Sequence, residues 1–131
     1  MDIERVVQQA GGTPLYVYDR QLIVERVRKL RSELPSELDI HYAVKANPMP
    51  AVIACLAPLV DGFDVASVGE MQSVLNFGAI PESVSFAGPA KSKASLRQAV
   101  AAGVTIHIES FREVDDLLDL ALHGDGGPVR V

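Results

Sequence analysis

The sequence predicts an α/β fold in which short parallel strands alternate with helices along most of the chain. Segments of β-forming residues and segments with helical periodicity alternate four times between residues 39 and 122, with short loops between them. Gly78, Gly103 and Gly124 stand where three of the helices should end, a position at which glycine commonly terminates helices. Repeated βα units of this size predict a parallel sheet covered by helices. Periodicity alone does not distinguish a closed barrel from an open doubly wound sheet.

Composition and charge restrict the classes of partner. The 131 residues are 48% hydrophobic and 22% charged with a net charge of −5, which is typical of a soluble globular domain or part of one. A mildly acidic chain without a basic run predicts no nucleic-acid partner and no membrane partner, and no apolar stretch reaches the roughly 18 residues of a membrane span. The N-terminus lacks the apolar region of a signal peptide, and a single cysteine, Cys55, fits a reducing cytoplasm. Without repeated Cys/His spacing, no metal site is predicted.

The first 34 residues are predicted to form a helix, a strand and a second helix. The first helix lies within residues 1–12 and should end at its two glycines. Residues 14–19 alternate in the manner of a strand. Asp19 can then cap a helix whose apolar residues recur at helical spacing up to Leu34, and whose charged residues form a solvent-exposed face rather than a binding patch.

From residue 35 onwards the alternation is regular. Strands are predicted over residues 39–45, 62–65, 84–87 and 105–108. Helices are predicted over residues 50–59, 69–77, 92–102 and 111–122. A fifth strand is expected to begin at Pro128, after a glycine-rich and flexible-looking loop over residues 123–127.

One lysine stands where the first strand of this alternation should end. Residues 40–44 alternate in β fashion, and Asn47-Pro48 is a turn signal that stops the strand. Lys45 is therefore predicted to be the last residue of a buried strand, with its amine at the C-terminal end, where α/β sheets bind ligands. Most lysines are solvated surface charges, but small Ala43 and Ala46 leave room around this one. A lysine amine withdrawn from water can form Schiff bases with carbonyl compounds.

The segment YAVKAN, residues 42–47, resembles the cofactor-lysine motif of the fold-type III pyridoxal-phosphate decarboxylases, the family of diaminopimelate, ornithine and arginine decarboxylases. Four further segments resemble this family in the same order, and the matches extend over nearly the whole chain. They are TPLYVYD at 13–19, GFDVASVGE at 62–70, FAGPAKS at 86–92 and Glu109-Ser110.

The resemblance implies a partial (β/α)8 TIM barrel of the alanine racemase type. Residues 35–131 would be about the first half of this pyridoxal-phosphate-binding barrel, and residues 1–34 would lead into it, with an N-terminal strand belonging to a second β domain. A whole barrel needs about 250 residues. The chain is therefore expected to be the N-terminal part of a larger enzyme.

The resemblance also assigns roles to residues at the strand ends. Lys45 would hold pyridoxal 5'-phosphate as a Schiff base, with Asp64 and Glu70 beside the cofactor. The border of the substrate site is expected to contain Ala43, Ser67, Lys91 and Glu109. Simpler structural roles compete with these: Asp64 as a turn former, Glu70 as an acid at a helix N-terminus, and Lys91 as a structural residue, which is favoured over catalysis.

The histidines are predicted to be structural. His41 and His107 alternate with apolar residues and should lie on the other face of their strands, packed against helices. In the resembled family the histidine that stacks on the cofactor, the glycine-rich phosphate loop and the acid that partners the pyridine nitrogen would all lie beyond the present sequence.

The function that the resemblance implies is decarboxylation of a small-molecule substrate, an amino acid such as diaminopimelate or another basic or diamino acid. The enzyme would be cytoplasmic and a homodimer at full length. Residues 47–50 and 86–92 are most similar to the branch associated with exosortase A. Pro89 stands where diaminopimelate decarboxylases usually carry asparagine, which leaves the substrate open. The alternatives are a non-catalytic pyridoxal-phosphate carrier or homeostasis protein, and an inactive truncated remnant.

Overall fold

A four-stranded parallel sheet forms the centre of the computed structural model, which describes residues 2–123 and 128–131. Each strand pairs with its neighbour in sequence, in the order β1-β2-β3-β4. The strands are β1 (His41–Ala43), β2 (Gly62–Val65), β3 (Val84–Phe86) and β4 (Thr105–Ile106). The predicted α/β fold with a parallel sheet is confirmed.

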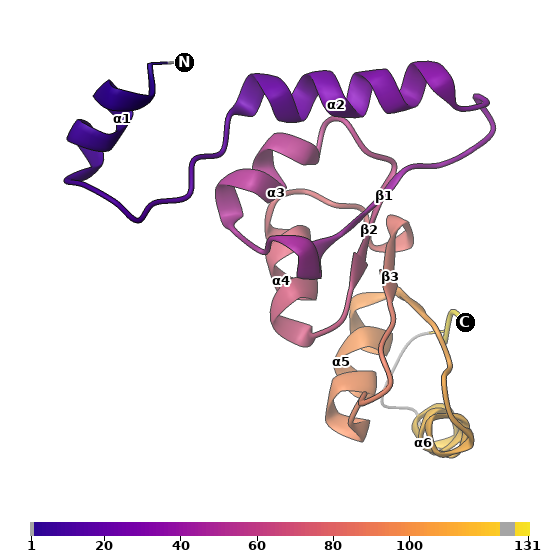
Figure 1. Cartoon of the computed structure of the whole chain (residues 1–131). Coiled ribbons are helices and arrows are strands. Elements are labelled where there is room, and N and C mark those ends of the chain that lie inside the picture. Colours follow the sequence, from indigo (N-terminus) through magenta and orange to yellow (C-terminus); the bar gives the residue numbers. More distant parts are fainter. Residues whose placement is uncertain (1, 124–127) are drawn as a thin grey trace.

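A helix follows each strand, as Figure 1 shows. These helices are α3 (Pro50–Leu56), α4 (Val68–Asn76), α5 (Lys93–Ala102) and α6 (Phe111–Leu122). Before the sheet come α1 (Ile3–Ala10) and α2 (Arg20–Glu33), and two single 3₁₀ turns, η1 (Val44–Ala46) and η2 (Pro81–Ser83), complete the elements. All six predicted helices are present, with ends that lie within three residues of those expected.

Capping residues that can be recognised in the sequence mark the ends of the helices. Asp19 accepts hydrogen bonds from the N–H groups of Gln21 and Leu22 at the start of α2. Gly103 takes the left-handed conformation, φ 75°, that ends α5. The predicted terminator Gly124 and the glycine-rich loop after His123 lie outside the described residues.

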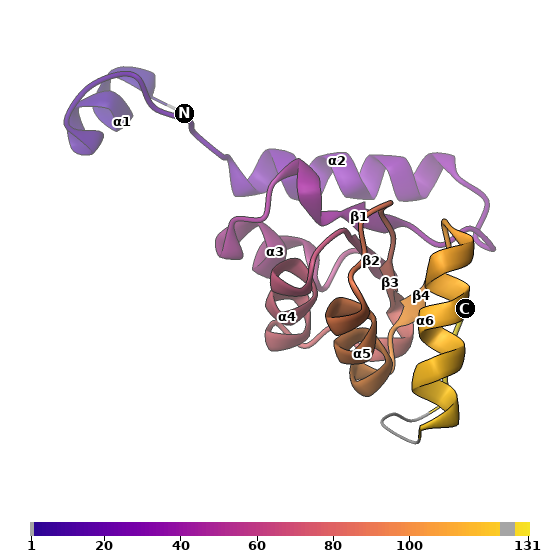
Figure 2. The ribbon, with the colours of Figure 1, turned by 90° about the horizontal axis from the view of Figure 1, so that it is seen from below.

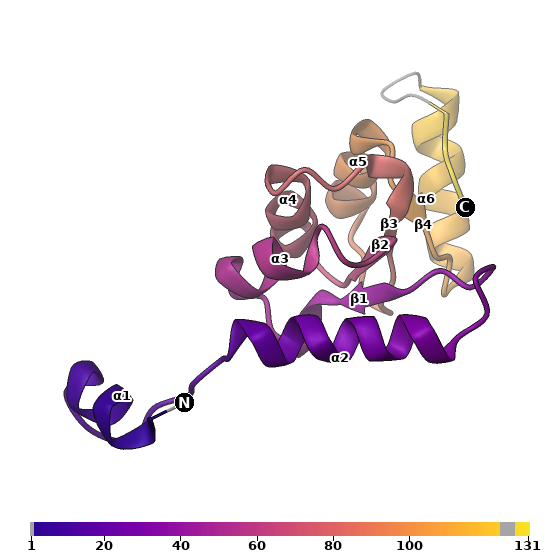
Figure 3. The same cartoon turned by 90° about the horizontal axis from the view of Figure 1, so that it is seen from above.

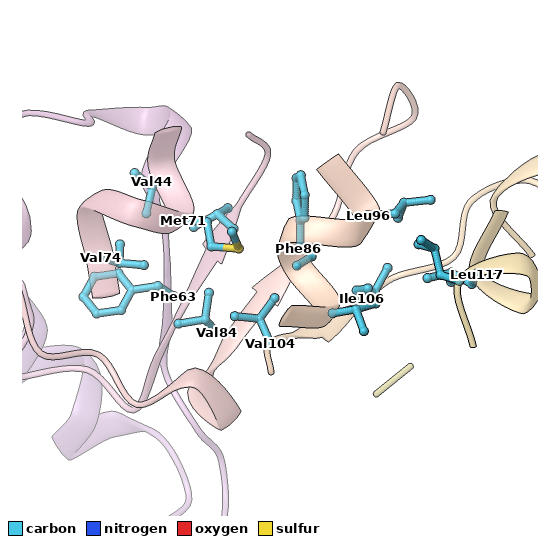
Figure 4. Close-up of a cluster of buried hydrophobic side chains, with 14 of the residues drawn as sticks. Val44, Phe63, Met71, Val74, Val84, Phe86, Leu96, Val104, Ile106 and Leu117 are labelled. Atoms are coloured by element: carbon cyan, nitrogen blue, oxygen red, sulfur yellow. The ribbon is translucent and has the colours of Figure 1, made fainter. Parts of the chain in front are cut away.

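Helices α3 to α6 cover a single face of the sheet, in an arc that Figure 3 shows from above. Strand residues on this face are buried and apolar, among them Phe63, Val65, Val84, Phe86 and Ile106. Figure 4 shows Phe63, Val84, Phe86 and Ile106 in one cluster with helix residues that include Met71, Val74, Leu96 and Leu117. Alternate residues point to opposite faces of a strand. The opposite face therefore carries His41, Ala43, Asp64, Ser85 and Thr105, which we call the polar face.

The predicted strand over residues 14–19 is absent. Residues 15–19 form no ladder with any described strand, and Tyr16 is 91% exposed. A strand requires a hydrogen-bonded partner, which the local alternation of side chains cannot supply. Figures 1 and 2 show this segment connecting α1, which stands apart from the sheet, to α2.

The first strand of the sheet is shorter than predicted. β1 ends at Ala43, and the next three residues form η1, because the N–H of Asn47 donates to the carbonyl of Val44 at 3.0 Å. The side chain of Asn47 then accepts from the N–H of Met49, which completes the turn. Lys45 is consequently an exposed residue of this turn, and not the last residue of a buried strand as predicted.

The start of the predicted fifth strand is visible as one parallel bridge. Arg130 pairs with Thr105, and the N–H of Ile106 donates to the Arg130 carbonyl at 2.9 Å. Among the described residues, none of the helices combines the length and the apolar character that a membrane crossing requires.

Candidate active site

The strand ends gather the predicted site residues at one edge of the sheet. The parallel pairing continues past the strands, since Ala87 N–H donates to the Val65 carbonyl at 2.9 Å and His107 N–H donates to the Phe86 carbonyl at 3.0 Å. The turn after β1 carries Lys45, and the loops after β2, β3 and β4 carry the other predicted residues. This C-terminal edge is where parallel α/β sheets bind ligands.

Lys45 lies just beyond a row of paired residues on the polar face. In that row Ala43 pairs with Asp64, Asp64 with Ser85, and Ser85 with Thr105. The described residues leave the Lys45 side chain exposed, so they do not provide the burial that the sequence predicted around it.

Asp64 is held by residues from the strands on both sides. Its Oδ1 accepts a hydrogen bond from Ser85 Oγ at 2.5 Å and lies 3.2 Å from His41 Nδ1. His41 therefore lies on the polar face, and its predicted packing against a helix is wrong. The prediction failed because the helices cover the face of Tyr42, and alternation alone does not say which face is covered. The same correction applies to His107, which is exposed.

Glu70 and Ser67 form a reciprocal cap at the start of α4. Ser67 Oγ accepts from the N–H of Glu70 at 3.2 Å, and Glu70 Oε2 accepts from the N–H of Ala66 at 2.8 Å. The carboxylate of Glu70 therefore has a structural partner in the loop after β2, in line with the simpler role that the sequence allowed it.

Lys91 belongs to a buried ion cluster that joins two loops. Its side chain is 1% exposed, and its Nζ lies 3.2 Å from Glu113 Oε2 and 3.8 Å from Glu109 Oε1. Nζ also donates to the Gly88 carbonyl at 2.5 Å, while Glu109 Oε1 accepts from the Gly88 N–H at 2.5 Å. Glu113 in turn accepts from the Glu109 N–H at 2.8 Å. These contacts support the structural role favoured for Lys91.

Sequence reasoning missed three residues of these networks. Glu113 could have been found, because Ser110-x-x-Glu113 repeats the spacing of Ser67-x-x-Glu70, and both pairs cap the helix that follows a strand. For His41 and Ser85 the sequence offers only the period-2 alternation of their strands. Within the described part of the chain, no group of three His, Cys, Asp or Glu side chains is placed to hold a metal ion.

Comparison with known proteins identifies the family. Residues 20–126 match the pyridoxal binding domain of pyridoxal-dependent decarboxylases. The chain belongs to this family. It is 39% identical over 114 residues to diaminopimelate decarboxylase of Aquifex aeolicus, covering 86% of this chain and 27% of that enzyme. It is 43% identical over 94 residues to ornithine decarboxylase of Leishmania donovani, covering 70% of this chain and 13% of that enzyme.

A solved structure shares the fold of nearly the whole chain. Diaminopimelate decarboxylase from Helicobacter pylori, complexed with L-lysine, superposes with a TM-score of 0.81 at 29% identity. The match covers 93% of this chain and 31% of that one. The chain thus spans less than a third of the length of these relatives.

Proposed function

We propose that the protein is a pyridoxal-phosphate-dependent amino-acid decarboxylase in which Lys45 holds the cofactor. The observation that carries the proposal is the position of the YAVKAN lysine. It is an exposed amine at the C-terminal edge of a parallel sheet, beside the polar face that bears Asp64. This edge lies within the segment that matches a pyridoxal binding domain.

We also propose that residues 35–131 are about half of a (β/α)8 barrel. Doubly wound sheets reverse their strand order at a switch point and carry helices on both faces. Here the four strands follow the chain order, and α3 to α6 cover one face, as in a segment of a barrel. The bridge at Arg130 supports a further parallel strand beside β4.

The residues at this edge fit the cofactor's chemistry. A primary amine is the group that attaches to an aldehyde, and Lys45 presents one in an open turn. Ala43 lies on the polar face, where Ala66 and Ala87 also fall by strand alternation, and methyl side chains leave space above the sheet for a flat ring. The phosphate group has no assigned partner among these residues.

Bound pyridoxal phosphate would supply an electron-withdrawing ring that takes up the electron pair left when CO₂ departs. Lys45 would hold the cofactor through its amine, a group that can also carry a proton. Asp64 offers a carboxylate acceptor that orients and balances a neighbouring ammonium group. The hydrogen-bond contacts of Asp64 with Ser85 and His41 both use Oδ1. Among the described residues, no hydrogen-bond donor contacts its Oδ2.

The proposed substrate is diaminopimelate or another basic or diamino acid, in line with the substrates that the names of the relatives give. Membership of the exosortase A-associated branch, a homodimer and a cytoplasmic location are proposed on the sequence resemblance alone. Ser67, Lys91 and Glu109 are proposed to border the substrate site, with Lys91 acting through the loops that it joins.

The test is turnover by the protein expressed from its complete gene. Released CO₂ is measured with meso-diaminopimelate, L-ornithine, L-lysine and L-arginine, for the native protein, Lys45→Ala and the control Lys29→Ala. Lys29 is an exposed lysine of α2 paired with Glu33. We expect Lys45→Ala to lose nearly all turnover of one diamino acid and Lys29→Ala to keep it. Bound cofactor without turnover of any substrate would instead indicate a carrier, and absence of cofactor a remnant.

A further inference from the structure

Side chains from three neighbouring strands meet at one carboxylate oxygen on the polar face, Oδ1 of Asp64. His41 comes from β1, Asp64 from β2 and Ser85 from β3. Ser85 Oγ lies 2.5 Å from Asp64 Oδ1, and His41 Nδ1 lies 3.2 Å from the same oxygen. Ser85 is only 7% exposed, although it lies on the face that no described helix covers.

The chemistry of the three groups determines which of them donate hydrogen bonds. An ionised carboxylate only accepts hydrogen bonds, so the Ser85 hydroxyl must donate and His41 must carry a hydrogen on Nδ1. Two donors from opposite sides of one oxygen restrict rotation of the carboxylate. Oδ1 is thereby occupied, and no donor to Oδ2 is present among the described residues.

Gly62 makes room for the histidine ring. A Cβ at this position would lie 2.5 Å from His41 Cε1 and 2.6 Å from Nε2, and would overlap the Ser83 carbonyl oxygen. The other nearby carboxylate, Asp61, is engaged by the Arg31 side chain and the Ile40 N–H. The ring is therefore held over Gly62, with Asp64 as its hydrogen-bonding partner.

We propose that His41 and Ser85 are positioning residues for Asp64: they fix Oδ1 and keep Oδ2 available to the group held at Lys45. The proposal rests on the proposed function, because it assigns Asp64 to the same cofactor site. Beyond that assignment, the proposal specifies the Nδ1–H tautomer of His41 and gives the two carboxylate oxygens different roles. Oδ1 is fixed by His41 and Ser85, and Oδ2 stays available to the group held at Lys45.

The first test needs no cofactor. In the cofactor-free protein with ¹⁵N-labelled histidine, long-range ¹H–¹⁵N spectra report which ring nitrogen carries the hydrogen, and His41→Asn assigns the signals. We expect His41 with hydrogen on Nδ1, shifting toward the Nε2–H tautomer or averaging in Asp64→Ala. An Nε2–H tautomer in the native protein, or no change in Asp64→Ala, overturns the proposal.

The second test is kinetic, on the substrate that the native protein turns over. His41→Leu removes the donor, whereas the amide nitrogen of His41→Asn can replace Nδ1–H. We expect His41→Leu and Ser85→Ala to lower kcat about tenfold, the effect of losing one hydrogen bond, with KM and cofactor content nearly unchanged. His41→Asn should recover most of the loss, and His123→Leu, at the end of α6, should have no effect.

The possible failures are distinguishable. Unchanged kcat in His41→Leu, or equal loss in His41→Leu and His41→Asn, overturns the positioning role while the proposed function stands. A native protein without lysine-bound cofactor overturns the proposed function, and the tautomer measurement then still decides whether His41 and Asp64 are coupled as inferred.

Discussion

At the residue scale, two lysines at the same edge of the sheet have opposite environments. Lys91 is enclosed, with ion pairs to Glu109 and Glu113. Lys45 is exposed in a turn. The Lys91 amine cannot reach a ligand without breaking its ion pairs, one of which is with the buried carboxylate of Glu113, whereas an exposed amine can. Burial therefore favours Lys45 over Lys91 for the proposed attachment of the cofactor, and it is in line with a structural role of Lys91.

Replacing Lys91 should be costly. Lys91→Met leaves the Glu113 carboxylate, 3% exposed, without its cation, and breaking a buried pair in this way costs about 3–5 kcal/mol. The measurement is the free energy of unfolding in urea. The control is Lys93→Met, which removes an exposed pair with Asp119 and should cost far less, because water screens an exposed pair. Equal losses in the two variants would show that the cluster does not hold the loops.

Gly62 is predicted to resist substitution. In Gly62→Ala the added methyl group would overlap the Ser83 carbonyl, which is backbone and cannot rotate away, so we expect a loss of about 1–3 kcal/mol. Gly69→Ala is the matched control, because its Cβ would meet only Ser67 Oγ at 4.0 Å and alanine favours the helix by up to about 1 kcal/mol. A Gly62→Ala protein with unchanged thermal stability would contradict the packing described for His41.

At the scale of elements, one carboxylate connects α2 to the start of the sheet. Asp61, between α3 and β2, accepts hydrogen bonds from Arg31 of α2 and from the N–H of Ile40. The hydrogen bond from Arg31, and after it that from Ile40, lowers the pKa of Asp61 from its ordinary value of 3.8. A carboxyl group whose pKa falls on folding stabilises the folded state in its ionised form.

The sign of this effect gives a pH-dependent prediction. Because the folded-state pKa is lowered, the stabilisation is present above pH 3.8 and is lost as the pH falls through the folded-state pKa. Asp61→Asn should therefore be less stable than the native protein at pH 7, and the difference should shrink at lower pH. Unfolding curves from pH 3 to 7 measure it, with Asp115→Asn, on the exposed side of α6, as the control. A difference that grows on acidification would contradict the assignment.

The sequence predicted the positions of the helices better than it predicted which segments pair and which face of the sheet is covered. The helix positions followed from caps and glycines such as Asp19 and Gly103, which act locally. The strand over residues 14–19 does not form among the described residues, because pairing depends on a partner strand that they do not supply. The prediction that His41 packs against a helix was wrong, because the packing depends on which side of the sheet the helices cover. The position of Lys45 at the strand edge was predictable, but its exposure was not.

At the scale of the whole molecule, the sheet has one apolar face and one polar face, and one segment of the chain has no partner strand among the described residues. Residues 14–19 are extended between α1 and α2, with Tyr16, Val17 and Tyr18 exposed. Exposed aromatic and β-branched residues in an unpaired segment are what a strand of a further domain would present.

Hydrogen exchange tests whether this segment pairs elsewhere. In the 131-residue chain alone, the amides of residues 15–18 have no acceptor in the described structure and should exchange as fast as those of an unfolded peptide. In the protein from its complete gene, pairing with a second domain should slow them. The amides of β2 serve as the internal control, because both of its neighbours pair with it. Fast exchange of residues 15–18 in both proteins would contradict the proposed second domain.

The central claim is that Lys45 carries pyridoxal phosphate. The measurement that tests it most directly is borohydride reduction of the native protein, followed by peptide mass analysis, which fixes the cofactor to its lysine irreversibly. We expect the reduced cofactor on the peptide that contains Lys45. The peptides of the buried Lys91 and the paired Lys93 should be unmodified. Cofactor on Lys91 or Lys93, or on no lysine of this chain, would contradict it.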